Sequence, residues 1–323
     1  MKKYVIKRLF TGLLAVAVVF VLNFLIIKAA PGSPVEILAG RDNPSQQLID
    51  NLNEKFGFNQ PLHVQLGKYI SNVLKGDMGD SLIYNQNVFS LIMEKMGTSL
   101  ILTMTAIVFA VVIGTALGLY CATHQGGITD KLFTSLSYVL NSMPSFWLAL
   151  MFIMIFATNL GWFPTSGITN IRYNYTGIRH ILDVMYHLFL PVVTLVLLQL
   201  PIYFKIAKSS VIQVLSEDFI TTFRATGMSK KKIYNKYVFK NAILPVITVF
   251  GISLAFVITG SVLVETVFSW PGTGRVMMNA IMNRDYPLIM GIYLILSLSI
   301  SIMMLLVDLV YAYVDPRIRN SYK

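Results

Sequence analysis

The stretch KIAKSSVIQVLSEDFITTFRATGMSKKKIYNKYVFKNAILP, from Lys205 to Pro245, lies between two long uncharged runs of the chain. It is basic and amphipathic, and it is too long to be a simple turn. The runs on either side are stable inside a membrane, whereas the stretch between them belongs at a membrane surface. We therefore expect it to be a docking surface, on which a protein outside the membrane pushes.

The composition of the whole chain excludes an ordinary soluble domain. Of its 323 residues, 55% are hydrophobic and only 13% are charged, whereas soluble proteins have roughly 25% charged residues. Six uncharged runs are long enough to cross a bilayer, for which about 20 residues suffice. We predict an all-α polytopic membrane protein with six transmembrane helices, at Leu9–Ile27, Gly97–Thr123, Leu132–Phe163, His187–Phe204, Ala242–Val264 and Pro287–Val307.

Two of these runs need interpretation. The first follows four basic residues and resembles a signal peptide, but its 19 residues exceed the apolar core of about 7–15 that signal peptides have, so we expect a retained helix. The third has 32 residues, which is too long for one straight span. We expect Pro144 and Gly161 to break it and Trp162 to lie at the level of the lipid headgroups.

The distribution of charge predicts the orientation. With the N-terminus inside, the inner segments hold 16 of the 26 basic residues and five of the 15 acidic residues. The inner face then carries the whole net charge of +11 and the outer face is neutral, as the positive-inside rule requires. The N- and C-termini are therefore expected in the cytoplasm. Because the membrane accounts for this charge, we expect no nucleic-acid partner.

The same orientation divides the chain into three parts. We expect residues 1–30 to form the cytoplasmic N-terminus and the first span, 31–96 an extracellular folded region, and 97–323 the core with spans two to six. The core includes the cytoplasmic loop 207–241. Within the extracellular region, helices are predicted at Ser45–Phe56 and Leu62–Leu74 from a cap residue and from helical periodicity.

The cytoplasmic loop has the signals of two short helices. Ser216 is a candidate N-cap, and Glu217 and Asp218 place negative charge on the first turn. Gly227 is a natural stop, and Ser229 is placed to cap a second, basic helix. The first helix has an apolar stripe of Phe219, Ile220 and Phe223. Two exposed phenylalanines favour a soluble partner with a receiving groove; the alternative is that they pack back on the membrane domain.

The chain itself contains no motif for energy conversion or catalysis. No phosphate-binding G-x-x-x-x-G-K-[ST] sequence occurs, and neither do H-E-x-x-H or G-x-S-x-G. The four histidines are scattered and the single cysteine, Cys121, lies in an apolar run. We therefore expect a protein that is not an enzyme and holds no metal. Glu265 and Asp308 lie at the ends of apolar runs, where structural pairing or snorkelling toward the membrane surface is the simplest role.

Several sequence motifs carry information that the composition of the chain does not. The sequence Asp218-Phe-Ile-Thr-Thr-Phe-Arg-Ala-Thr-Gly227 precedes Asn241-Ala-Ile-Leu-Pro245, whose proline lies eighteen residues after the glycine. Together with further motifs along the chain, these two sequences resemble the B-type permease subunit of oligopeptide, dipeptide and nickel ABC importers, and the resemblance covers nearly the whole chain. The others are Ala30-Pro-Gly-Ser-Pro34, Phe56-Gly-Phe-Asn-Gln-Pro-Leu62 with Gln65, Gly76-Asp-Met-Gly-Asp-Ser81, Ser142-Met-Pro-Ser-Phe-Trp147, Glu265-Thr-Val-Phe-Ser-Trp-Pro-Gly272, Arg284-Asp-Tyr-Pro287, Asp308-Leu-Val-Tyr311 and Asp315-Pro-Arg317.

The loop departs from the family pattern in two places. General importers have Glu-Ala-Ala where this chain has Thr221-Thr222-Phe223, and the peptide branch tends to have Ala and Lys where Phe223 and Thr226 stand. Neither change removes the helix or its glycine. They bear only on which side chains seat the loop in an ATPase.

The resemblance implies a type I ABC-importer permease fold in the bacterial inner membrane. It implies a heterodimer with a C-type permease, two ABC ATPase subunits inside and an extracellular peptide-binding lipoprotein, all in contact with membrane lipid. ATP and Mg²⁺ would bind the ATPases, and no cofactor would bind this chain. The residues expected to contact the ATPase are Glu217, Asp218, Phe219, Thr222, Phe223, Arg224, Ala225, Gly227 and Met228.

The cargo and the pathway are less determined by the sequence. The family covers both peptides and nickel, and a self-sufficient secondary transporter is a third possibility, for which we see neither midplane charges nor an inverted repeat. Serines and an asparagine along the third span suit a wet, adaptable cavity or close helix packing. We expect the pathway to be lined by Asn141, Ser142, Pro144, Trp147 and Glu265.

Overall fold

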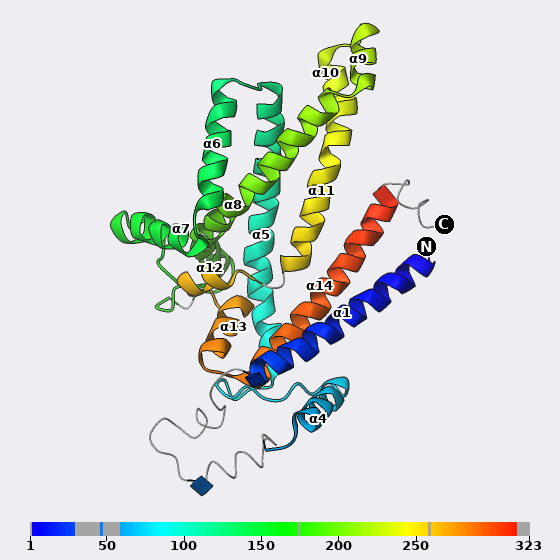
Figure 1. Cartoon of the computed structure of the whole chain (residues 1–323). Helices are drawn as coiled ribbons and strands as arrows, with labels where there is room; N and C mark the ends of the chain where they lie inside the picture. Colours follow the sequence, from blue (N-terminus) through cyan, green and yellow to red (C-terminus); the bar gives the residue numbers. More distant parts are fainter. Residues whose placement is uncertain (1, 30–45, 48–58, 174, 258–259, 315–323) are drawn as a thin grey trace. The chain divides into compact units, whose positions relative to one another are not determined.

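The computed structural model describes residues 2–29, 46–47, 59–173, 175–257 and 260–314 (Figure 1). These parts are helical, with one isolated bridge between Asp80 and Asn87 and no strand. The predicted all-α class is confirmed. The elements are α1 (Lys2–Ala29), α4 (Leu62–Leu74), α5 (Val88–Thr123), α6 (Ile128–Ser142), α7 (Ser145–Phe152), the π-helix η1 (Ile153–Asn159), α8 (Ile178–Leu215), α9 (Asp218–Ala225), α10 (Lys230–Ile233), the π-helix η2 (Tyr234–Val238), α11 (Phe239–Phe256), α12 (Val262–Val267), α13 (Thr273–Met282) and α14 (Tyr286–Val314).

Among the described residues, five helices are long and apolar enough to span a membrane. A sixth span is counted if Ile128–Ser142 and Ser145–Asn159 are taken together, although they are bent by 104° relative to each other. The bend lies at Pro144, whose backbone is extended (ψ 135°), as expected from a residue that cannot donate a backbone hydrogen bond. The second predicted break also holds, since η1 ends at Asn159 and Gly161 is left-handed (φ 63°).

Two predicted boundaries are wrong. The run His187–Phe204 covers less than half of α8, which has 38 residues and is therefore about 57 Å long, nearly twice the thickness of the hydrocarbon core. The predicted run Ala242–Val264 is divided, because α11 ends at Phe256 and α12 is a separate helix that carries Glu265. Gly260, between them, has a φ of 67°, which a helix does not accept.

The extracellular helix predicted at Leu62–Leu74 is present as α4 with those bounds, directly after Pro61. The helix predicted at Ser45–Phe56 lies almost wholly outside the described residues. One motif of this region is joined in space to a distant one, since the Ser81 hydroxyl donates to the Asp285 carboxylate at 2.5 Å. That carboxylate is fully buried and also accepts the backbone N–H groups of Ile83 and Leu288. The partition into 1–30, 31–96 and 97–323 stays a prediction.

The chain forms two compact units. The first comprises Met1–Ser99, Ile258–Val262 and Pro271–Lys323. In it α1 packs along α14, with Phe24 and Ile27 of α1 in one apolar cluster with Ile289 and Ile292 of α14. The pairing expected for Asp308 is confirmed, because Arg8 Nε lies 2.7 Å from its carboxylate.

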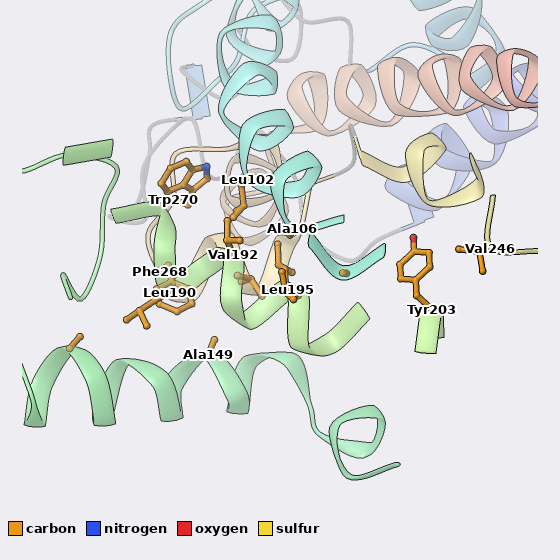
Figure 2. Packing of buried hydrophobic residues seen from close by; sticks show 14 of the residues in the cluster. Leu102, Ala106, Ala149, Leu190, Val192, Leu195, Tyr203, Val246, Phe268 and Trp270 are labelled. Atoms are coloured by element: carbon orange, nitrogen blue, oxygen red, sulfur yellow. The ribbon is translucent and has the colours of Figure 1, made fainter. Parts of the chain in front are cut away.

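The second unit comprises Leu100–Val257 and Leu263–Trp270. Its core joins α5, α7, α8 and α11 with the segment around Trp270, as Figure 2 shows for Leu102, Leu195 and Val246. Here α5 and α8 approach closely at Gly114 and Gly118. A Cβ atom on Gly118 would lie 2.6 Å from the carbonyl oxygen of Phe204 and 2.8 Å from Cβ of Ala207. Glycines four residues apart let two membrane helices meet backbone to backbone.

We predict that Gly118→Val destabilises the second unit, because the added side chain forces α8 away from α5. Overpacking of this kind costs about 1–3 kcal/mol. Thermal unfolding of the purified protein in detergent measures the loss. Gly97→Val is the matched control on the same helix, since nothing lies within 4 Å of a Cβ atom there. Equal melting temperatures for the two variants would contradict the close approach.

Candidate functional site: the surface of the loop helix

The loop helix α9 follows α8 after a tight turn, and α9 and α10 lie at the end of α8 and α11 (Figure 1). The prediction that Ser216 caps this helix is wrong. Because α8 continues to Leu215, Ser216 is its C-cap, and its hydroxyl donates to the carbonyl of Gln213 at 2.7 Å. The N-cap of α9 is Glu217, with an extended backbone. Ser229 takes the predicted N-cap position of α10.

Gly227 ends α9 as predicted. Its φ of 78° is left-handed, a conformation that glycine adopts without steric cost. The N–H of Gly227 donates to the carbonyl of Arg224 at 3.1 Å, and the N–H of Met228 donates to the carbonyl of Phe223 at 3.2 Å. This pair of bonds is a Schellman motif, which satisfies carbonyls that the end of the helix would leave free.

The inner face of α9 is anchored by Ile220, which is fully buried. Ile220 belongs to an apolar cluster with Val211 of α8, Val238 of η2 and Ala242 of α11. Burying one such side chain contributes about 1.5–3 kcal/mol. An eight-residue helix is too short to be stable alone in water, so this cluster holds α9 in place.

The two phenylalanines of the stripe have different surroundings. Phe223 is half-buried, and its ring lies 4.3 Å from the ring of Tyr237. Phe219 is 37% exposed and meets Phe223 edge to face at 5.9 Å. The ring of Phe223 is therefore partly covered by a contact within the chain, whereas Phe219 presents part of its ring outward. Phe223 packs against Tyr237 of the predicted loop and the apolar cluster around Ile220, and which surface the two phenylalanines use in an assembly stays a prediction.

The outer face of α9 and its ends remains exposed. Met228 is half-buried beside Phe223 against the apolar cluster. The acidic first turn and Arg224 in the last turn complement the helix dipole. Of the residues expected to contact an ATPase, those exposed are Glu217, Asp218, Phe219, Thr222, Arg224, Ala225 and Gly227.

The loop that carries α9 is also joined to α5 by a hydrogen bond. The hydroxyl of Tyr234, in η2, donates to the carbonyl of Leu119 in α5 at 3.1 Å. The hydroxyl of Tyr203, in α8, donates to that of Ser253 in α11 at 2.8 Å. These two bonds join η2 to α5 and α8 to α11, so direct contacts connect the elements next to α9.

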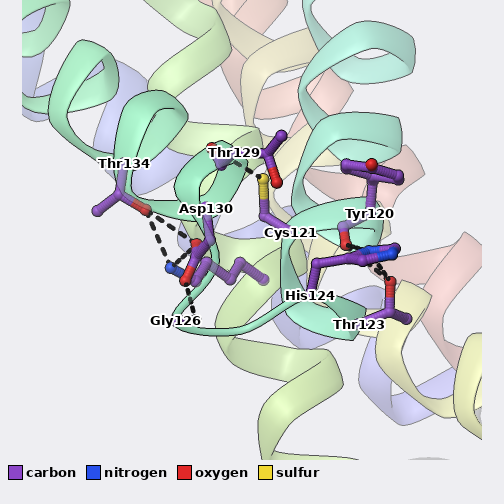
Figure 3. Close-up of polar contacts among 9 residues, drawn as sticks. Tyr120, Cys121, Thr123, His124, Gly126, Thr129, Asp130 and Thr134 are labelled. Carbon is purple, nitrogen blue, oxygen red and sulfur yellow. Dashed lines mark hydrogen bonds and ion pairs between the residues drawn. The ribbon is translucent and has the colours of Figure 1, made fainter.

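A second polar contact at α8 is not evident from the sequence. Asp130, at the start of α6 and 6% exposed, forms an ion pair with Lys208 of α8. Its carboxylate also accepts the N–H of Gly126 at 3.0 Å and the hydroxyl of Thr134 at 3.2 Å (Figure 3). The only signal in the sequence is one acidic residue in a short inner loop, and nothing there identifies Lys208 as its partner.

The residues expected to line a pathway divide into two groups. Asn141, Ser142, Pro144 and Trp147 are exposed along the bend between α6 and α7. Glu265 is fully buried in α12, beside Phe268 and Trp270 of the core. Ser137 is buried, which agrees with close packing for that position. That these five residues line one pathway stays a prediction.

The chain matches two family descriptions. Residues 114–320 match the binding-protein-dependent transport system inner membrane component, and residues 1–103 match the N-terminal part of the corresponding membrane component. Within the described residues, no group of three His, Cys, Asp or Glu side chains is placed to hold a metal.

Curated relatives are similar over the full length. A probable peptide ABC transporter permease of Sinorhizobium fredii is 35% identical, with 98% of this chain and 99% of that protein covered. The oligopeptide transport system permease AppB of Bacillus subtilis is 34% identical with the same coverage. The glutathione transport system permease GsiC of Salmonella paratyphi A is 35% identical, with 99% of both chains covered.

A solved structure shares the fold. A chain of the inward-facing MetNI methionine ABC transporter has a TM-score of 0.51 and 17% sequence identity, and the match covers 70% of this chain and 97% of that one. At this identity the likeness concerns the fold alone. It agrees with the predicted type I permease fold.

We predict that Ile220→Asn releases α9, because a polar amide cannot replace the apolar contacts of the cluster. Trypsin should then cut at Arg224 and Lys230 at least about tenfold faster, since 1.4 kcal/mol changes an equilibrium tenfold and an isoleucine contributes more. Thr221→Asn is the control, as it places the same side chain on the exposed neighbouring position. Equal cleavage rates would show that Ile220 does not hold the helix.

Proposed function

Since the chain belongs to the family of binding-protein-dependent transport system inner membrane components, we propose that its α9 surface receives an ATPase subunit and that the cargo it passes is oligopeptides. The chain is a permease subunit of an ABC importer of the peptide type and a multi-pass protein of the inner membrane. Such importers work with ATPase and substrate-binding partners in general. We propose the roles of particular residues within this function.

One observation carries the proposal for α9. The helix is fixed by Ile220 on its inner face, and its outer face, with Phe219, is exposed. A short helix seated firmly on one side and open on the other suits a groove in a soluble protein. The chain has no phosphate-binding loop of its own, so the driving force has to arrive through such a contact.

The contacts behind α9 suggest how motion passes on. The cluster around Ile220 contains residues of α8 and α11, and the ion pair of Asp130 and Lys208 joins the loop before α6 to α8. When ATP binding closes the ATPases, α9 would move with them and carry these helix ends as one body. The opening of the cavity would then change sides, which is alternating access by a bistable helix bundle.

The proposed assembly follows the family. This chain would form half of the pathway beside a second, C-type permease. Two ATPase subunits would bind ATP and Mg²⁺ inside, and a lipoprotein that binds peptides would deliver cargo outside. The proposal assigns no cofactor and no catalytic step to this chain.

The relatives support peptides as cargo. Their names refer to peptide, oligopeptide, glutathione and dipeptide transport, and glutathione is itself a small peptide derivative. Exposed polar side chains at the bend between α6 and α7, such as Asn141 and Ser142, offer hydrogen bonds that many peptides can use. Chelated nickel is the alternative cargo, and an uptake assay distinguishes it from oligopeptides.

We predict that Phe219→Asp weakens binding of the ATPase subunits at least about tenfold, because it places a charge where an aromatic ring would fill a groove. Co-purification from detergent extracts measures the retained ATPase. Thr221→Asp, on the same helix, introduces the same charge at an exposed position outside the expected contact set. Undiminished co-purification of the Phe219 variant would oppose docking at this surface.

We also predict the cargo preference of the assembled importer. Proteoliposomes that contain this chain with its permease, ATPase and binding-protein partners should accumulate labelled oligopeptides when ATP and Mg²⁺ are present. Labelled nickel should not accumulate above the level seen without ATP. Uptake of nickel without uptake of peptide would overturn the peptide assignment and leave the role as an importer permease intact.

A further inference from the structure

A cavity of about 180 Å³ lies within the first unit, where the end of α1, α4 and the start of α14 come together (Figure 1). A single water molecule needs only about 10–15 Å³ on the same kind of measure. The cavity therefore has room for a chemical group considerably larger than water. None of the interactions discussed above uses it.

Two tyrosines that line this cavity have buried hydroxyls without a hydrogen-bond partner among the described residues. Tyr286, at the start of α14, is only 7% exposed, and its hydroxyl is completely shielded. The hydroxyl of Tyr69, on α4, is shielded in the same way. Buried hydroxyls of this kind are normally satisfied by protein or ligand. Two of them around one cavity point to a ligand that accepts hydrogen bonds.

The chemistry of Tyr69 suits a donor. Its ring stacks on Phe20 of α1 at 5.2 Å, which fixes its orientation. Burial raises the pKa of the Tyr69 phenol, so the group stays protonated at neutral pH and keeps an O–H to donate. The ligand atom that it faces should therefore be a hydrogen-bond acceptor, such as an oxygen.

Two opposite charges also border the cavity. Lys28 lies at the end of α1, and Asp77 follows α4. One oxygen of Asp77 accepts the N–H of Gly79 at 2.8 Å. The rest of the lining is apolar and includes Phe24, Ile27 and Met290. A ligand that matches this lining has a negative and a positive group close together and an apolar body beside them.

The position of the cavity along the helices indicates the source of such a ligand. With the N-terminus inside, the end of α1 and the start of α14 lie at the outer border of the bilayer. Tyrosine is enriched at this level, where lipid headgroups meet the apolar core, and a lysine near a helix end extends its charged group toward it. Phospholipids with both charges in one headgroup are present there at high local concentration.

We propose that this cavity binds the headgroup of a phosphatidylethanolamine molecule of the outer leaflet. The phosphate oxygens accept hydrogen bonds from Tyr69 and Tyr286, and Lys28 adds a positive charge beside them. The ammonium group lies toward Asp77, and the acyl chains leave along the apolar side chains of α1 and α14. The inference depends on the orientation in the membrane and is independent of the cargo and of the ATPase contact.

The test compares lipid binding by the full chain in its purified complex. Native mass spectrometry would measure retention of phosphatidylethanolamine by the wild type and by the double variant Tyr69→Phe, Tyr286→Phe. Loss of two hydrogen bonds to a charged phosphate should weaken retention about tenfold or more. Tyr120→Phe, an exposed tyrosine outside the cavity, is the control. Equal retention by the double variant and the wild type would overturn the site.

Further arms identify the ligand. Asp77→Asn keeps an oxygen for the N–H of Gly79 but removes the charge, so it should weaken phosphatidylethanolamine more than phosphatidylglycerol. Inorganic phosphate and soluble phosphoethanolamine should not compete at millimolar concentration, because they lack the apolar body. Competition by phosphate would reassign the cavity to a free anion. Equal preference for both lipids in the wild type would overturn the role of Asp77.

A thermal measurement separates this result from misfolding. In detergent without lipid, the double variant should melt no lower than the wild type, because the lost hydroxyls have no partner among the residues that the structure describes. Added phosphatidylethanolamine should raise the melting temperature of the wild type and leave that of the double variant nearly unchanged. An equal rise in both would exclude the tyrosines from the lipid contact.

Discussion

The absence of water in the hydrocarbon core constrains this protein more than any single contact does. Every backbone N–H and C=O at that depth needs a partner within the protein, so the spans are helices. Once the helices are formed, the hydrophobic effect no longer drives them together, and close packing takes its place. Gly114 and Gly118 meet this requirement where α5 and α8 touch, since neither position has room for a side chain.

The functional surface depends on the continuation of one of these helices beyond the membrane. With 38 residues, α8 is much longer than the bilayer is thick, and its last turns offer an apolar platform outside the core. On this platform Ile220 fixes α9, and the Schellman motif at Gly227 turns the chain toward α11. The connection between α9 and the long helices arises from ordinary burial and capping, and it is the property that the proposed transmission of force would need.

Much of the arrangement could be predicted from local signals. Apolar runs located the spans, Pro144 located the bend, Pro61 and helical periodicity located α4, and Gly227 located the end of α9. The errors lie where tertiary contacts override local preference. Ser216 has the chemistry of an N-cap, but it ends α8 because packing of Val211 and its neighbours keeps that helix intact up to Leu215. Likewise, α11 and α12 are divided by a left-handed glycine inside an uninterrupted apolar run.

The sequence by itself determined the membrane class and the family and predicted the orientation, because hydropathy, charge asymmetry and motif order are properties of the chain alone. The tertiary structure decided which side chains meet. It turned Phe223 onto Tyr237 and left Phe219 partly outside, paired Asp130 with Lys208, joined Ser81 to Asp285, and placed two tyrosines with buried hydroxyls along one cavity. These partners are far apart along the chain or on different helices, and only the packing of those helices brings them within contact distance.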